Sequence, residues 1–91
     1  MKQFTDLNEL LETLRPILRK GKINKFYIRR PKNNPLEIKI RFKIHLPNFA
    51  NIQGEIWGLH RPNIDISIDL QNEFVTIIFR REPSTNTLQE P

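Results

Sequence analysis

The sequence predicts an α+β domain in which an N-terminal helix precedes a five-stranded, mostly antiparallel sheet that is strongly curved or barrel-like. Three observations lead to this prediction. Apolar residues recur at helical spacing over residues 6–20, and apolar and polar residues alternate without a break over residues 36–46. The later apolar runs are joined by about three to five residues, a length that favours antiparallel neighbours.

The helix predicted over residues 6–20 has signals at both of its ends. Asp6, or the threonine before it, can cap the start, and Glu9 follows Asp6 at capping-box spacing. Gly21 can adopt the left-handed conformation that ends a helix. Pro16 lacks an N–H and crowds the preceding turn, so we expect a kink or a break near it. The apolar stripe consists of Leu7, Leu10, Leu11, Leu14, Ile17 and Leu18.

The strands predicted after the helix differ in how polar their second face is. Residues 36–46 form the clearest strand, with one apolar face and one basic face. In residues 64–70 the polar face instead carries Asp65 and Asp69. If these two strands are neighbours, Lys39 or Lys43 can pair with either aspartate and neutralise part of the basic face. The other three strands are predicted over residues 23–30, 52–60 and 74–79.

Two of these strands, 52–60 and 74–79, are apolar on both faces, and one helix cannot cover both sides of a sheet. Closure of the sheet, a homodimer or a partner surface would bury the second side. Trp57 and Leu59 share a face of the first of these strands and are the candidate interface residues. Gly54 and Gly58 favour a sharp bend there, as a curved sheet requires.

The chain length of 91 residues fits one domain, predicted over residues 1–81, with a flexible tail over residues 82–91. No residue is a cysteine, which excludes disulfides and thiolate chemistry. No apolar run approaches the ~20 residues that span a bilayer. We therefore expect a cytoplasmic protein without membrane contact.

Catalytic and cofactor motifs are not found in the sequence. His45 and His60 lack the spacing of metal ligands, and Ser67 lies between two aspartates without a base in a known motif. The three glycines form no nucleotide-binding loop. These observations predict a protein that is not an enzyme and needs no cofactor or metal.

The positive charge is concentrated in one part of the chain. The net charge of +5 is the difference between +8 over residues 1–43 and −3 over residues 44–91. Residues 19–32 alone hold seven positive charges in fourteen positions. Such a surface attracts nucleic acid, phosphorylated ligands or an acidic protein, although a positive face can also serve solubility alone.

The first functional hypothesis is a small basic module that binds RNA or single-stranded DNA through the outer face of the first two strands. The order of one helix and five strands resembles that of the Sm-like RNA-binding fold, without that family's sequence motifs. The alternative is a protein-interaction module, such as a subunit, adaptor or inhibitor, that binds through the second apolar sheet face or an exposed edge, in one version as a homodimer. An acidic partner protein would instead use the positive face. The candidate nucleic-acid contacts are Lys22, Lys25, Tyr27, Arg29, Arg30, Lys32, Lys39, Arg41 and Lys43.

Overall fold

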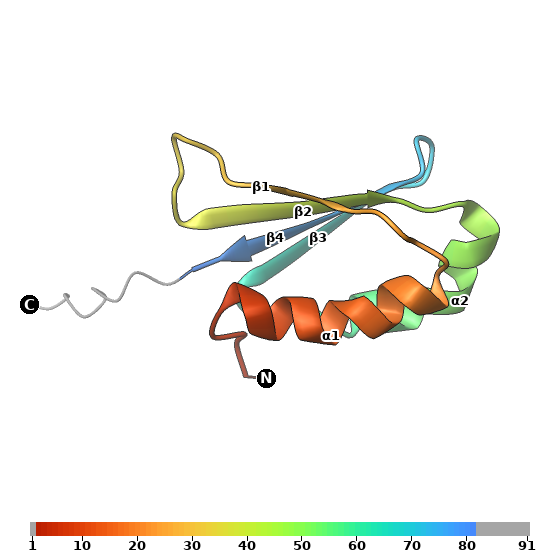
Figure 1. The fold of residues 1–91 in the computed structure, drawn as a ribbon, viewed down its shortest axis with the longest axis horizontal. Coiled ribbons are helices and arrows are strands. Elements are labelled where there is room, and N and C mark those ends of the chain that lie inside the picture. Colours follow the sequence, from red (N-terminus) through yellow and green to blue (C-terminus); the bar gives the residue numbers. More distant parts are fainter. Residues whose placement is uncertain (1, 82–91) are drawn as a thin grey trace, which may run out of the picture.

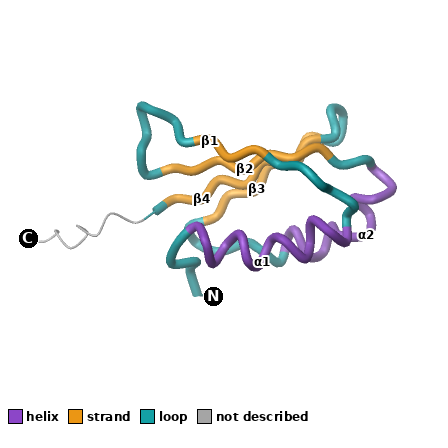
Figure 2. The backbone as a smooth tube through the Cα atoms, viewed as in Figure 1, coloured by secondary structure: helices purple, strands orange, loops and turns teal. Residues whose placement is uncertain are grey.

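The computed structural model describes residues 2–81 as two helices packed on one side of an antiparallel sheet (Figures 1 and 2). The predicted tail over residues 82–91 lies outside the described residues. Within the described part the α+β class is confirmed, but the sheet has four strands and is open. The elements are α1 (Leu7–Lys20), β1 (Tyr27–Arg29), β2 (Glu37–Lys43), α2 (Leu46–Trp57), β3 (Ile64–Asp69) and β4 (Phe74–Arg80).

The strands lie in the order β1-β2-β4-β3, and each adjacent pair is antiparallel. Strand β4 therefore separates β2 from β3. Both helices cover the same face, so the opposite face is open along all four strands (Figure 1). The prediction of a fifth strand and of barrel-like curvature was wrong, and the likeness in element order to the Sm-like fold is lost with it.

The segment predicted as a strand over residues 52–60 belongs mostly to helix α2. Pro47 occupies its first turn, where the missing N–H has no cost. Phe49, Ile52 and Ile56 are buried at spacings of three and four, which places them on one side of a helix. In the structure both helices cover the core face of the sheet, whereas the second apolar face expected for residues 74–79, with Phe74 and Ile78, lies on the open side (Figure 1).

Because residues 52–57 are helical, the two glycines and the two candidate interface residues of this segment have other roles than the strand prediction gave them. Gly54 lies inside α2, and Gly58 is its C-cap, so neither bends a strand. Trp57 is 50% exposed at the end of the helix, whereas Leu59 is buried at 1%. The two residues therefore do not form the shared surface that the strand prediction implied.

Helix α1 runs unbroken through Pro16, so of the kink or break expected near this proline the break does not occur. Asp6 is the N-cap, and its carboxylate accepts a hydrogen bond from the Glu9 N–H at 2.9 Å. The carboxylate of Glu9 in turn accepts from the backbone N–H and the hydroxyl of Thr5, which lowers its pKa. This is a capping box displaced by one residue.

At the end of α1, the residue with a left-handed backbone conformation is not the one that the sequence predicted. Gly21 has φ −84°, while Lys22 has φ 59°. Gly21 is closely packed instead: a Cβ at this position would lie 2.8 Å from Cδ1 of Ile52 and 3.2 Å from Cδ1 of Ile44. The absence of a side chain at Gly21 lets the ends of these two isoleucines pack against the end of α1 without a shift.

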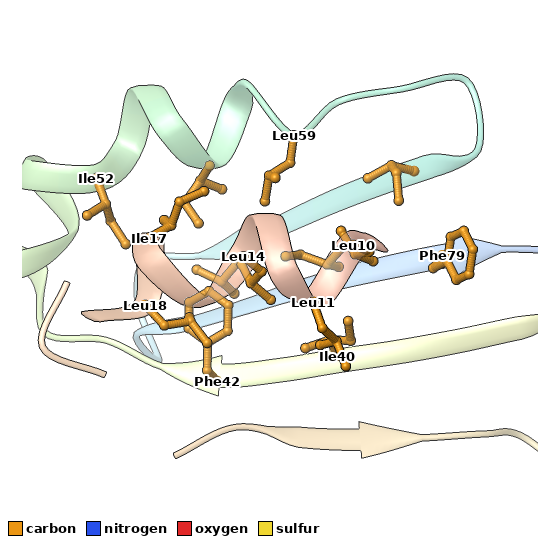
Figure 3. Packing of buried hydrophobic residues seen from close by; sticks show 14 of the residues in the cluster. Leu10, Leu11, Leu14, Ile17, Leu18, Ile40, Phe42, Ile52, Leu59 and Phe79 are labelled. Carbon is orange, nitrogen blue, oxygen red and sulfur yellow. The ribbon is translucent and has the colours of Figure 1, made fainter. Parts of the chain in front are cut away.

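One hydrophobic cluster fills the space between the sheet and the helices (Figure 3). Leu10 and Leu14 of α1 are fully buried against the inward-facing residues of the sheet. On β2 and β4 every second residue points into this cluster, so the intervening residues must face away from it. Ile66 and Ile68 of β3 are partly buried against the same cluster. The buried sheet residues are Ile38, Ile40, Phe42, Ile64, Val75, Ile77 and Phe79.

Candidate nucleic-acid interface

The open face of the sheet changes from basic to acidic across the strands. Residues directly opposite each other in an antiparallel pair share a face, so the register defines the rows of this surface. One row runs from Tyr27 through Arg41 and Thr76 to Ser67. The neighbouring row runs from Arg29 through Lys39 and Ile78 to Asp65.

A shallow depression of about 450 Å³ lies over the basic side of this face. We call it the basic groove, and its lining combines cationic, aromatic and hydroxyl groups from β1, β2 and β4. The Tyr27 side chain is 59% exposed, so the face of its ring is accessible to a ligand. The lining residues are Tyr27, Arg29, Lys39, Arg41, Phe74 and Thr76.

The cations of the basic groove form no close ion pair with a carboxylate among the described residues. The hydrogen bonds from Asn72, and to a smaller extent the charge of Arg41, lower the pKa of Asp69. The ion pairs found among residues 2–81 involve neither Arg29, Lys39 nor Arg41. The Arg41 guanidinium instead lies 4.6 Å from the centre of the Phe74 ring, and Nζ of Lys43 lies 5.7 Å from it. The ring thus holds two cations on the open face without cancelling their charge.

The aspartates on the β3 side of the open face are bound by other side chains of the protein. Arg80 forms ion pairs with Asp65 and, at 3.5 Å, with Glu37. Asp69 accepts hydrogen bonds from the side-chain amide and the backbone N–H of Asn72, which lower its pKa. The cross-strand pairs considered from sequence, between Lys39 or Lys43 and these aspartates, do not form, because β4 lies between the two strands.

A second hollow, of about 370 Å³, adjoins the basic groove, since Tyr27 and Phe74 line both. It lies where the segment after α1, the end of β2 and the start of α2 meet. We call it the lysine pocket. Its polar lining comes from Lys22, Lys25, Lys43, His45, Asn24 and Asn48, and its apolar lining from Ile23 and Ile44, beside Gly21.

Seven of the nine nucleic-acid contacts predicted from sequence line one of these two hollows. Arg30 and Lys32 are exposed in the connection between β1 and β2 and line neither. Sequence reasoning missed Phe74 and Thr76 of β4, together with His45 and the asparagines of the lysine pocket. The alternation in residues 74–79 already placed Phe74 opposite the core residues, but only the register brings it beside Lys43.

Within the described residues, no group of three or more histidine, aspartate or glutamate side chains could hold a metal ion. No helix of this part is long and apolar enough to cross a membrane. Comparisons with protein-family models, with curated proteins and with solved structures found no match for the chain. The two hollows therefore carry the proposal for the function.

Proposed function

We propose that this protein is a non-enzymatic module that binds single-stranded nucleic acid, RNA or DNA, across the basic groove. The observation that carries the proposal is the groove itself, where cations without carboxylate partners surround two aromatic rings. Phosphate groups recruit such cations, and unpaired bases stack on such rings. A cytoplasmic location belongs to the same proposal.

The electrostatic part of the proposal concerns Arg29, Lys39 and Arg41. Their side chains need not break an ion pair before they contact phosphates, so each contact releases counterions from the nucleic acid at little cost to the protein. The acidic residues of β3, at the edge of the sheet, limit the path that a bound nucleic-acid strand can take. A chain of phosphates is repelled from Asp65 and Asp69 and is expected to follow β1 and β2.

The aromatic part of the proposal distinguishes single strands from duplexes. Bases within a duplex are stacked on each other and have no free face for Tyr27 or Phe74. An unpaired base can stack on the exposed Tyr27 ring, a contact worth ~1–3 kcal/mol. We therefore expect single strands to bind more tightly than duplexes of the same length.

Fluorescence anisotropy with a labelled twelve-nucleotide single strand and its duplex, each at 50 and 200 mM salt, tests the proposal. We expect the single strand to bind more tightly at low salt and to lose affinity steeply at high salt. Lys39→Glu should weaken binding, while Arg15→Glu, the same charge change on α1, should have little effect. Absence of binding at 50 mM salt would reject the function.

The exposed Trp57 favours a second candidate, a protein-interaction module that forms a homodimer through the end of α2. Light scattering on wild type and Trp57→Ala tests it. A dimer that becomes a monomer in Trp57→Ala, with unchanged oligonucleotide binding, would support this second surface. A monomeric wild type would reject the homodimer.

A further inference from the structure

The lysine pocket concentrates more positive charge than a phosphodiester needs. Lys22, Lys25 and Lys43 meet there with His45, and its lining contains no carboxylate. Its volume of about 370 Å³ lies within the range of small-molecule sites. A phosphodiester carries one negative charge, whereas a phosphomonoester carries about −1.5 to −2 at neutral pH. The pocket thus fits a doubly charged group better than a passing backbone.

Lys22 occupies a backbone conformation that is unfavourable for a lysine. Its φ of 59° lies in the left-handed region, where a glycine is less strained. The end of α1 accounts for this conformation, because the N–H of Lys22 donates to the carbonyl of Arg19 at 3.0 Å and the N–H of Ile23 donates to the carbonyl of Leu18 at 2.9 Å. The exposed side chain of Lys22 belongs to none of the ion pairs among residues 2–81. At a position that favours glycine, the lysine thus adds an unpaired charge to the lining of the pocket.

The other non-glycine residue with positive φ in the described part, Glu73 at 59°, supports the wall of the same pocket. One oxygen of its carboxylate accepts from the backbone N–H of Leu46 at 3.2 Å and fixes the start of α2. The other oxygen lies 3.6 Å from Nδ1 of His45, which lines the pocket. Both non-glycine residues with positive φ in the described part therefore lie beside the same pocket.

We propose that the lysine pocket binds the phosphorylated end of a single-stranded nucleic acid, a nucleotide that carries a phosphomonoester. This inference rests on the proposed function, because the rest of the strand would occupy the basic groove. The exposed ring of Tyr27, which lines both hollows, is placed to stack the terminal base, and the three lysines line the pocket that would hold its phosphate. The pocket then determines where a bound strand begins.

Three versions of one ten-nucleotide single strand, labelled at an internal position, test this inference on the wild-type protein. One has a 5′-phosphate, one a 3′-phosphate, and one has hydroxyls at both ends. We expect one of the phosphorylated strands to bind about tenfold more tightly than the hydroxyl-ended strand. Equal affinities for all three would overturn end recognition and leave the proposed function intact, whereas no binding by any of them would reject both.

A nucleoside monophosphate used as competitor separates a strand end from a free nucleotide. We expect it to displace the phosphorylated strand only at concentrations far above the dissociation constant of that strand, because it gains nothing from the basic groove. A monophosphate that binds as tightly as the phosphorylated strand would contradict the inference and indicate a free nucleotide as the ligand.

Lys22→Gly tests the residue without threatening the fold, since glycine suits its backbone conformation. We expect its unfolding midpoint to be equal to or higher than that of wild type, while the preference for the phosphorylated end falls about fivefold. Lys32→Gly removes the same charge outside the pocket and should keep the full preference. Retention of the full preference in Lys22→Gly would overturn the assignment of the pocket.

Discussion

The two faces of the sheet are built from the same strands but depend on different physics. The inner face packs Ile40, Phe42 and Ile77 against the helices, and all three are fully buried. The outer face carries alternate residues of the same strands, among them Lys39 and Arg41. Because stability depends on the inner face and the proposed binding on the outer one, substitutions on the two faces should have separable effects.

The outer face itself has two halves, one in which the charged side chains are paired with each other and one in which they are not. On the β3 side, Asp65 and Asp69 are held by Arg80 and Asn72. On the β1–β2 side, Lys39 has no partner among the ion pairs of residues 2–81. The net charge of +5 therefore understates the positive charge that is available to a ligand at one half of this face.

The largest effect on binding is expected for the triple variant Lys39→Glu, Arg41→Glu and Lys43→Glu. It replaces three cations of the open face with carboxylates, so single-strand affinity should fall by about two to three orders of magnitude. The slope of log affinity against log salt should decrease by about 2, since each lost phosphate contact contributes about 0.7. Anisotropy measurements over a salt series would show this, and an unchanged slope would place the binding surface elsewhere.

Leu14→Ala should have the opposite effect, lowering the stability of the fold and leaving the affinity for single strands unchanged. Leu14 is fully buried between α1 and the sheet, and truncation of such a side chain costs about 2–5 kcal/mol of unfolding free energy. Single-strand affinity of the folded variant should stay within twofold of wild type, because Leu14 lies on the covered side. Urea unfolding and anisotropy together check both parts. A loss of affinity in the fully folded variant would mean that the faces are not separable.

Tyr27→Ala should reduce binding with little effect on stability. The side chain is more than half exposed, so unfolding free energy should change by less than about 0.5 kcal/mol. Loss of a stacked base should lower single-strand affinity about tenfold. Tyr27→Phe keeps the ring and should bind as wild type does. Equal losses in both variants would attribute the effect to the hydroxyl group instead of stacking.

The smallest effect is expected for Asp69→Ala, which should change how the stability of the fold depends on pH. Hydrogen bonds from Asn72 lower the pKa of the Asp69 carboxyl, so the ionised form stabilises the fold. This contribution is complete above the unfolded-state pKa, near 3.9, and is lost as pH falls through the lower folded-state pKa. The stability difference between wild type and Asp69→Ala should therefore shrink below about pH 4. Thermal unfolding at pH 7 and pH 3 measures it.

Much of the fold could be predicted because periodicity was unambiguous in most elements. Helix α1 and strands β2, β3 and β4 follow their expected patterns. Ile52 and Ile56 were ambiguous, since a spacing of four places residues on one face of a strand as well as on one side of a helix. Phe49, three residues before Ile52, fits only the helix, and Pro47 favours a helix start. Those two signals could have identified α2.

The candidate site was predictable in its charge but not in its assembly. Alternation over residues 36–46 placed Lys39, Arg41 and Lys43 on one face, as the register confirms. Strand order cannot be read from alternation, so neither the contact of Lys43 with Phe74 nor the separation of Lys39 from Asp65 followed from sequence. Both depend on β4 pairing between β2 and β3.

The central claim is that the basic half of the open face binds a single strand. Titration of ¹⁵N-labelled protein with an unlabelled ten-nucleotide single strand, followed by NMR, tests it residue by residue. We predict that amide shifts change over β1, β2 and the start of β4, around Tyr27, Arg41 and Phe74, while residues of α1 facing solvent stay unchanged. Changes confined to the helices, including the surroundings of Trp57, would contradict the account.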